Sequence, residues 1–393
     1  MIEVDIKNIK EEESGSEEDE VTEENGSPGP EIDGIFKSAV YLKTGLAVSL
    51  NKEYLLHMAA KFGNTDCNIA VSQSDLLCNV YSVDNHFKTI YTIPKADDTI
   101  VNLRFATDND NLLYTGSADC KIKLWDLREN GKCVSEFTDK SGKKLTSFDV
   151  SCNERFICGG TGVLDADSFL LFWDVRSTKL LGGYWDSHSG DVTQVCFHPS
   201  VQDTLATGST DGLINIFDIS QPTESEALNQ TLNTESSVDK VSWHYIENNQ
   251  LISCITHTED LQLWQQDGVS PKRIFTRNEL ACSLKINEEN LYLAGIHHLN
   301  DSELMVLAGS VATNKKMKCL RSAIVSCKNL RPLTSYNENQ QIVRCSCYNQ
   351  GTGSLITGGE GGLLNLWVPS QTDEEVHTKL KVTNKIKHKN KPY

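Results

Sequence analysis

A segment with a period in the forties recurs along most of this chain, and residues 187–218 hold its best preserved copy. That copy contains three short apolar runs, 192–197, 205–209 and 213–217. His198-Pro199 with its polar followers separates the first two runs, and Thr210-Asp211-Gly212 separates the last two, so each run is expected to be a strand. The tight Asp-Gly turn predicts that the third strand runs antiparallel to the second. None of the runs alternates cleanly between polar and apolar residues, as expected where both faces of a small sheet are covered.

The residue that closes the third strand gives the period. These closing positions are 81, 125, 173, 217, 264, 320 and 367, spaced by 44, 48, 44, 47, 56 and 47 residues. Four copies have an aspartate six residues before a closing aromatic; these pairs are Asp75 and Tyr81, Asp119 and Trp125, Asp167 and Trp173, and Asp211 and Phe217. Trp264 and Trp367 keep the six-residue offset without the aspartate, and Leu320 fills the remaining position without an aromatic ring. The chain therefore holds seven units.

Seven such units predict an all-β fold, a seven-bladed β-propeller. About four short strands per unit are typical of propeller blades, because one small sheet cannot bury both of its faces until neighbouring sheets stack around a ring. We expect residues 34–370 to form this ring as one domain, flanked by an acidic tail, 1–33, and a lysine-rich tail, 371–393.

The units resemble WD repeats. The residues that carry the resemblance are Trp125-Asp126, Trp173-Asp174, Phe217-Asp218 and His188 in Ser-His-Ser-Gly-Asp. Blades of that family often share a hydrogen-bond set of His, Ser or Thr, Asp and Trp, which implies structural roles for His188, Thr207 and Asp211 in the fourth unit. Phe217 stands in the tryptophan position of that set and has no indole N–H to donate.

The resemblance also implies how the ring closes. In WD-repeat rings the N-terminal strand usually completes the last blade, and residues 38–50 precede the first repeat without a blade of their own. We expect this segment to pair in the blade whose third strand ends at Trp367, which would remove the open edges of the ring.

Charge is distributed unevenly along the chain. The first 33 residues hold 13 acidic residues against Lys7 and Lys10, too polar a composition to fold, so we expect disorder. Ser14 and Ser16 precede acids and are candidate phosphorylation sites, although this head is equally interpreted as a solvated tail. Residues 379–391 carry six lysines, which suit either a nuclear-import or RNA-contacting segment or a solvated end.

The body of the chain is acidic. Removing the −11 of residues 1–33 and the +6 of residues 379–391 from the formal −17 leaves −12 for residues 34–378. Wide nucleic-acid contact by the propeller is therefore not expected, because phosphate binding depends on positive charge. The sequence has no apolar run long enough for a membrane span and no signal-peptide pattern, so we expect an intracellular protein of the nucleus, the cytoplasm or both.

Cysteine and histidine patterns indicate packing rather than chemistry. The thirteen cysteines are odd in number and mostly sit in apolar strand segments, which suits free thiols in a reducing compartment. Cys345-Ser346-Cys347 has the wrong spacing for a zinc site. His257, His297 and His298 lack carboxylates or cysteines at ligand spacing and are interpreted as loop or surface residues. We expect no metal and no cofactor.

Two insertions are expected on the surface. The polar stretch 220–237 predicts a long loop between the fourth and fifth units, and 161–167 widens a turn in the third unit. Loops on a rigid ring often carry partner contacts, and they are equally often insertions without a role.

Two successive units end in a doubled motif. They read Trp125-Asp126-Leu127-Arg128 and Trp173-Asp174-Val175-Arg176, and no other unit has an arginine two residues after the aspartate. The doubled motif resembles one in WD-repeat substrate receptors of cullin-4 ubiquitin ligases, which implies that Arg128 and Arg176, with Asp126 and Asp174, bind the ligase's propeller adaptor. The flat guanidinium suits such contacts. The alternative is that each arginine pairs with an acid of a neighbouring blade.

These patterns indicate a non-catalytic scaffold for protein–protein interactions. The chain has no Gly-x-Ser-x-Gly elbow, phosphate-binding Lys-Ser/Thr loop or His-Glu-x-x-His, and Gly351-Thr352-Gly353 lacks the third glycine of a dinucleotide motif. We expect no enzyme, and a monomer outside its complexes. The alternatives are a cullin-4 substrate receptor, indicated by the paired arginines, and a nuclear assembly or ribosome-biogenesis scaffold, indicated only by the charged tails.

Overall fold

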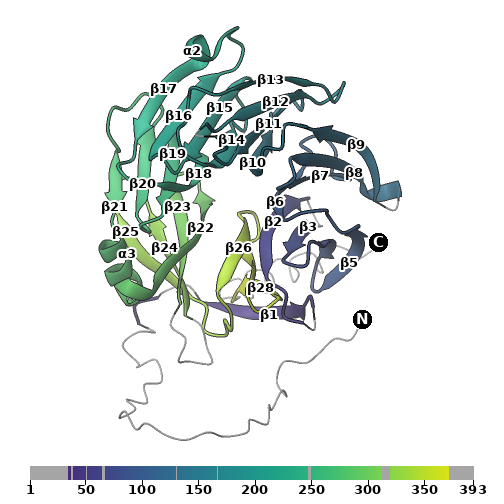
Figure 1. Ribbon diagram of the computed structural model, residues 1–393. Helices are drawn as coiled ribbons and strands as arrows, with labels where there is room; N and C mark the ends of the chain where they lie inside the picture. Colours follow the sequence, from purple (N-terminus) through teal and green to yellow (C-terminus); the bar gives the residue numbers. More distant parts are fainter. Residues whose placement is uncertain are drawn as a thin grey trace, which may run out of the picture.

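The fold is a ring of seven four-stranded antiparallel sheets (Figure 1). The computed structural model describes residues 34–36, 39–49, 51–63, 67–129, 131–165, 167–246, 249–311 and 319–370. The predicted all-β, seven-bladed propeller is confirmed. The two predicted tails, with the candidate phosphorylation sites Ser14 and Ser16, lie outside the described residues.

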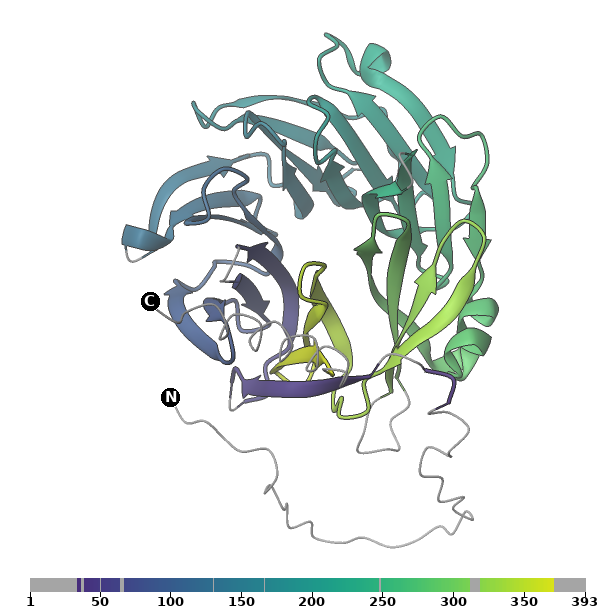
Figure 2. The same cartoon turned by 180° about the vertical axis from the view of Figure 1, so that it is seen from behind.

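Each blade runs from an inner strand at the ring centre to an outer strand at the rim (Figure 2). The first four blades are β2 (Leu55–Phe62), β3 (Cys67–Gln73), β4 (Cys78–Val83) and β5 (Phe87–Ile93); β6 (Ile100–Phe105), β7 (Leu112–Ser117), β8 (Lys121–Asp126) and β9 (Lys132–Thr138); β10 (Leu145–Val150), β11 (Phe156–Thr161), β12 (Leu170–Asp174) and β13 (Leu180–Tyr184); and β14 (Val192–Phe197), β15 (Thr204–Ser209), β16 (Leu213–Asp218) and β17 (Leu228–Asn233). The last three are β18 (Val238–Ile246), β19 (Asn249–Thr256), β20 (Leu261–Gln265) and β21 (Arg273–Phe275); β22 (Leu291–Asn300), β23 (Glu303–Ser310), β24 (Leu320–Val325) and β25 (Leu330–Ser335); and β26 (Val343–Asn349), β27 (Ser354–Gly359) and β28 (Leu363–Pro369) with β1 (Val40–Ala47).

The ring closes through its N-terminal strand. β1 pairs antiparallel with β28, from Val40 opposite Pro369 to Ala47 opposite Leu363, and Figure 1 shows the two strands side by side at the first and last colours of the chain. The expectation that this N-terminal segment completes the last blade is therefore confirmed for β1, while Ser38 and Leu50 lie outside the described residues.

Turn chemistry follows the sequence in the best preserved unit. Gly212 follows Asp211 between β15 and β16 and has a φ of +84°, a left-handed conformation that glycine adopts without strain. The Asp211 carboxylate accepts the Leu213 N–H at 2.9 Å, which holds the turn.

The prediction of a long loop over 220–237 is wrong. This stretch contains a short helix, α2 (Glu224–Ala227), capped by the Thr223 side chain, and then the outer strand β17. Alternate side chains of β17 are exposed because an outer strand faces solvent, so a polar sequence suits it. The widened turn at 161–167 is confirmed, with one bridge between Leu164 and Asp167.

The sixth blade departs from the repeat at its closing position. In the other blades the closing residue pairs with the residue four before the end of the second strand, as Trp125 pairs with Leu113. The corresponding pair in this blade is Val306 with Ala323, so Leu320 opens β24 instead of closing it. The cause is the long connection between β23 and β24, which breaks the six-residue offset.

The core beside Ala323 is filled by a helix. α3 (Arg277–Leu284) begins at the Thr276 cap and places Leu280, Ala281 and Leu284 in the same buried cluster as Ala323. In the described part of the chain, two 3-10 turns, η2 (Leu127–Glu129) and η3 (Glu288–Asn290), complete the helical elements. Within the described residues, no helix has the length and apolar character needed to cross a membrane.

All thirteen cysteines lie within the described residues, and none of them forms a disulfide there. Five of them are buried: Cys78, Cys120, Cys158, Cys254 and Cys345. Burial raises the pKa of the Cys345 thiol to about 12, so this group stays protonated and packs as a small apolar side chain.

Candidate functional site: paired arginines on one face of the ring

The doubled motif places two arginines on the same face of adjacent blades. β8 and β12 are the third strands of their blades, and each continues directly into an arginine-bearing turn. The N–H of Leu127 donates to the carbonyl of Asn111 at 2.9 Å, and the N–H of Val175 donates to that of Arg155 at 3.0 Å. Asn111 and Arg155 lie in the turns between first and second strands, so both arginines lie on the face that carries those turns.

Arg128 is held by the aspartate of its own motif. Asp126 Oδ1 accepts the backbone N–H of Arg128 at 2.9 Å and its Nε–H at 3.1 Å, while Oδ2 accepts from Nη2 at 2.7 Å. The side-chain hydrogen bond to Arg128 and then its backbone N–H lower the pKa of Asp126 to about 2. The aspartate thus fixes both the turn and the plane of the guanidinium.

Arg176 repeats this arrangement more loosely. Asp174 Oδ1 accepts the backbone N–H of Arg176 at 2.8 Å, and Nη2 of Arg176 lies 3.6 Å from Oδ2. The Arg176 side chain is 76% exposed and that of Arg128 is 60% exposed. Both guanidinium groups therefore present donors to solvent from neighbouring blades.

The alternative, that these arginines pair with acids of neighbouring blades, is not what the structure shows. Each arginine pairs within its own Trp-Asp-x-Arg motif. Exposed ion pairs of this kind contribute about 0–1 kcal/mol to folding. So small a contribution to folding does not explain why the motif occurs twice, and a role at the protein surface explains it better.

The fourth blade contains the histidine-centred set expected from the repeat. His188 Nδ1 lies 3.0 Å from Asp211 Oδ2, and its Nε2 lies 2.7 Å from Thr207 Oγ1. Phe217 is fully buried beside this set, with its ring 5.5 Å from that of Tyr184. Burial raises the pKa of Asp211, but the His188 hydrogen bond and charge with two backbone N–H groups outweigh it, so the pKa is lowered overall.

The comparisons with known proteins agree with this geometry. The family model described as "WD domain, G-beta repeat" matches residues 87–126 and 180–218. These two segments correspond to β5–β8 and β13–β16. Each matched repeat therefore joins the outer strand of one blade to three strands of the next. The chain is a WD-repeat propeller. Relatives that it matches over two thirds or more of their length carry WD-repeat names.

Three relatives show the extent of the likeness. The WD repeat-containing protein 89 homolog of Dictyostelium discoideum is 23% identical, covering 81% of this chain and 88% of the relative. An uncharacterized WD repeat-containing protein of Schizosaccharomyces pombe is 24% identical, covering 70% and 84% respectively. WD repeat-containing protein GTS1 of Arabidopsis thaliana is 26% identical, covering 69% and 68%.

The aromatic closing residues of the WD repeats make different contacts from blade to blade. The indole N–H of Trp125 donates to Thr115 at 2.9 Å, and that of Trp367 donates to Thr357 at 3.0 Å. Three other aromatic closing residues make different contacts: Trp264 donates to the Gln262 side chain, Trp173 donates to the carbonyl of Thr138 in the preceding blade, and Tyr81 packs edge-on against Phe87. A buried indole N–H needs some acceptor, and the acceptor differs from blade to blade.

The turn aspartates of the WD repeats also differ. Asp75 accepts the Leu77 N–H at 3.2 Å, Asp119 pairs with Lys121 at 2.6 Å, and Asp167 is an exposed residue of the widened turn. Of these repeat aspartates in the described residues, Asp211 is the one bonded to a histidine. The histidine, threonine and aspartate of the set therefore occur together in the fourth blade, where Phe217 stands in place of the tryptophan.

Replacing His188 should destabilise the WD-repeat ring. His188→Ala would leave the buried Asp211 carboxylate and Thr207 hydroxyl without their shared partner, at a cost of about 2 kcal/mol. Urea unfolding measures the loss. His257 lies in an exposed turn, so His257→Ala serves as the control and should change the free energy of unfolding little. Equal effects of the two substitutions would contradict a bonding role for His188.

The interpretation of His297 and His298 as loop or surface residues is wrong. Both lie in the inner strand β22: His297 Nε2 is 2.8 Å from Ser346 Oγ, and His298 Nε2 is 3.1 Å from His244 Nδ1. Burial, followed by the charges of Lys240 and His298, lowers the pKa of His297 to about 4. His257, by contrast, is exposed in a turn as expected.

Sequence reasoning missed the residues that line the ring centre. Arg104 and Asp149 form an ion pair there at 3.0 Å, and Lys240 lies nearby on the inner strand of the fifth blade. Each occupies a different repeat and belongs to no contiguous motif. The register of the inner strands is the only signal that could have found them.

Proposed function

We propose that this WD-repeat propeller is a non-catalytic scaffold that binds another protein through the face carrying Arg128 and Arg176. WD-repeat propellers are generally protein-interaction scaffolds without catalysis. The observation that supports this face is the pair of exposed, aspartate-oriented guanidinium groups on adjacent blades. Arginine is favoured at protein interfaces because its fork contacts carboxylates and carbonyls with fixed geometry.

A more specific form of this function is a substrate receptor of a cullin-4 ubiquitin ligase. The observation that favours it is that both motifs point outward on one face instead of pairing across blades. In this proposal the propeller adaptor of the ligase binds Arg128 and Arg176, and another part of the ring binds the substrate. The third alternative, a nuclear assembly or ribosome-biogenesis scaffold, rests on tails that lie outside the described residues.

Replacing both arginines should abolish binding of the adaptor. The tagged wild-type chain is purified from cells, and the ligase's propeller adaptor is quantified by mass spectrometry beside Arg128→Ala with Arg176→Ala. Loss of two central interface arginines commonly costs about 2 kcal/mol each, so we expect the adaptor to fall at least about tenfold.

The matched control is an arginine on the same face. Arg331 is the second residue of β25 in the sixth blade, is 59% exposed and pairs with Glu303. Arg331→Ala should retain the adaptor. Absence of the adaptor from the wild type would contradict the ligase role, while loss of every recurrent partner in the double variant would still support the scaffold face.

A further inference from the structure

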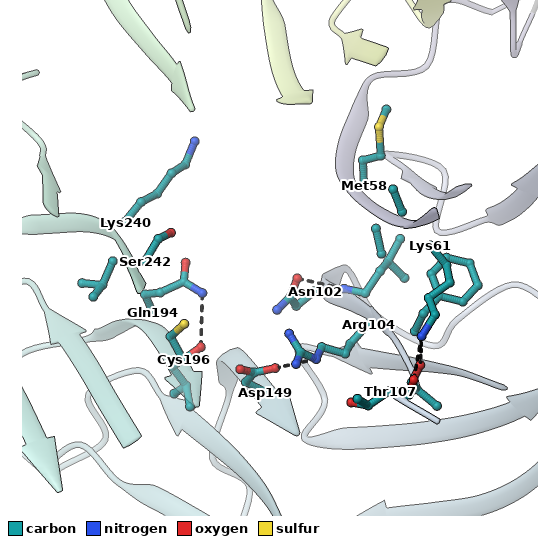
Figure 3. Close-up of a pocket in the computed structure, with 17 residues that line it drawn as sticks. Met58, Lys61, Asn102, Arg104, Thr107, Asp149, Gln194, Cys196, Lys240 and Ser242 are labelled. Atoms are coloured by element: carbon teal, nitrogen blue, oxygen red, sulfur yellow. Dashed lines mark hydrogen bonds and ion pairs between the residues drawn. The ribbon is translucent and has the colours of Figure 1, made fainter. Parts of the chain in front are cut away.

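The ring centre contains a cavity of about 480 Å³. The inner strands of the first five blades line it, and in Figure 3 Lys240 and Gln194 lie on one side, with Asn102 and Arg104 on the other and open space between them. This volume falls in the range of pockets that hold a small ligand or part of a peptide.

The charged groups that line the cavity are three cations and one acid. The cations are Lys61, Arg104 and Lys240, and the acid is Asp149. Without residues 1–33 and 379–391, the chain has a net charge of −12. A positive lining inside an acidic ring is therefore a local feature and not a result of general basicity.

Lys61 is fully occupied at one end of the cavity. Its Nζ donates to the carbonyls of Ala106 at 3.1 Å and Thr107 at 2.7 Å, and it lies 3.2 Å from Asp110. Lys61 therefore stabilises the turn after β6, and we assign it no contact with a ligand.

Arg104 is only partly used by Asp149. Its Nε lies 3.0 Å from Asp149 Oδ1, while the other oxygen of Asp149 accepts the Phe197 N–H at 2.8 Å. In the described part of the chain the terminal nitrogens of Arg104 have no hydrogen-bond partner, and its side chain is 37% exposed. Its guanidinium thus retains donors toward the cavity.

Lys240 has no acid to neutralise it. Its Nζ donates to the Ala294 carbonyl at 3.0 Å, and across the described ranges no carboxylate lies within ion-pair distance of it. Burial and then the Lys240 charge lower the pKa of His57 and of His297 to about 4. The Lys240 ammonium therefore acts on two other inner strands, β2 and β22, without a counter-charge.

We propose that the central cavity binds an acidic segment of a partner protein, whose carboxylates contact Lys240 and the free donors of Arg104. The two cations come from the fifth and second blades, so an extended chain entering the ring centre reaches both. A nucleic acid is disfavoured as the occupant, because its regularly spaced phosphates would run beyond the cations of the cavity into the acidic body, whereas a short acidic segment needs to place only a few carboxylates there. This site is separate from Arg128 and Arg176 and does not depend on the proposed scaffold face.

The test uses the full chain and a fluorescein-labelled oligoglutamate peptide, with binding measured by fluorescence anisotropy. Removing one charge-assisted contact should weaken binding about tenfold in Lys240→Gln. Lys88→Gln makes the same charge change on the exposed outer strand β5 and should bind as the wild type does. Thermal melting of both variants checks that they remain folded. Arg128→Ala with Arg176→Ala should bind the peptide normally, which separates this site from the scaffold face.

Two results would overturn the proposal. One is equal affinity of the wild type, Lys240→Gln and Lys88→Gln. The other is that the wild type does not bind the peptide. This includes the case in which the peptide binds only after the acidic residues of 1–33 are neutralised, since that segment of the chain itself would then be the occupant of the cavity. The acids to neutralise are Glu11, Glu12, Glu13, Glu17, Glu18, Asp19 and Glu20.

Discussion

Removal of residues 38–50 should abolish the cooperative unfolding transition of this protein. These residues include β1, the fourth strand of the last blade. Without β1, the backbone of β28 from Leu363 to Pro369 loses its hydrogen-bonded neighbour and becomes an open edge. The ring also loses the pairing that joins the N-terminal part of the chain to its last blade.

The deletion also removes side chains from two buried clusters. Val40 and Leu42 pack against the cluster that holds Trp367, and Leu46 and Val48 pack against the cluster that holds Leu55. Burying each such side chain contributes about 1.5–3 kcal/mol at most. Their combined loss is comparable with the whole stability of a typical domain, about 5–15 kcal/mol.

Differential scanning calorimetry measures this effect. The wild type should show a cooperative transition and the deletion should show none. Deleting residues 1–33 is the control and should leave the transition unchanged, because no strand begins before Val40 in the described chain. A synthetic peptide of residues 38–50, added in excess, should restore part of the transition by mass action. A cooperative melt in the deletion at the wild-type temperature would contradict closure by β1.

The sequence was informative about the fold because propeller repeats act locally. A closing aromatic and a turn aspartate recur at nearly constant spacing, so Asp211 and Phe217 were enough to find the other blades. The same method failed where spacing changed: Leu320 was misplaced because the connection before β24 is long. The outer strand β17 was missed because an exposed edge strand has the composition of a loop.

The two candidate sites differ in how visible they are in sequence. Arg128 and Arg176 belong to contiguous four-residue motifs, and the structure adds only that both face solvent on one side of the ring. Lys240 and Arg104 are three repeats apart in the sequence. They line the same cavity only because the ring arranges the inner strands around one axis. His297 was misinterpreted for the same reason, since an inner strand can carry polar residues toward a channel.

Breaking the central ion pair from its cationic side should strongly destabilise the ring. Asp149 is a buried carboxylate, with its side chain only 6% exposed, and Arg104 is its cationic partner. Arg104→Met would leave this carboxylate with the N–H groups of Phe197 and Val150 and no counter-charge. Removing one partner of a buried pair costs about 3–5 kcal/mol, and we expect the lower end because Arg104 is partly exposed.

The loss should depend on pH in a defined direction. Burial raises the pKa of Asp149 above its usual value, although Arg104 and the two N–H groups oppose the shift. A carboxyl whose folded pKa is raised favours folding most when protonated, below its unfolded pKa, and that contribution is lost as pH rises through the folded pKa. Without Arg104 the pKa rises further. The deficit of Arg104→Met should therefore be small in acid and grow toward neutral pH.

Urea unfolding at several pH values tests this prediction. Arg104→Met with Asp149→Asn should be more stable at neutral pH than Arg104→Met alone, because the amide carries no buried charge, although its single oxygen can accept only one of the two N–H groups that the carboxylate oxygens accept. Arg344→Met removes an exposed pair with Glu360 and should cost no more than about 1 kcal/mol at any of these pH values. If Arg104→Met costs no more than Arg344→Met, or if its deficit does not change with pH, the pair at the ring centre does not stabilise the fold electrostatically. A large loss of stability in Arg104→Met that Asp149→Asn relieves would show that Arg104 stabilises the ring by neutralising the buried carboxylate of Asp149. Neutralising Asp149 uses the Nε of Arg104 and leaves its terminal nitrogens for the cavity.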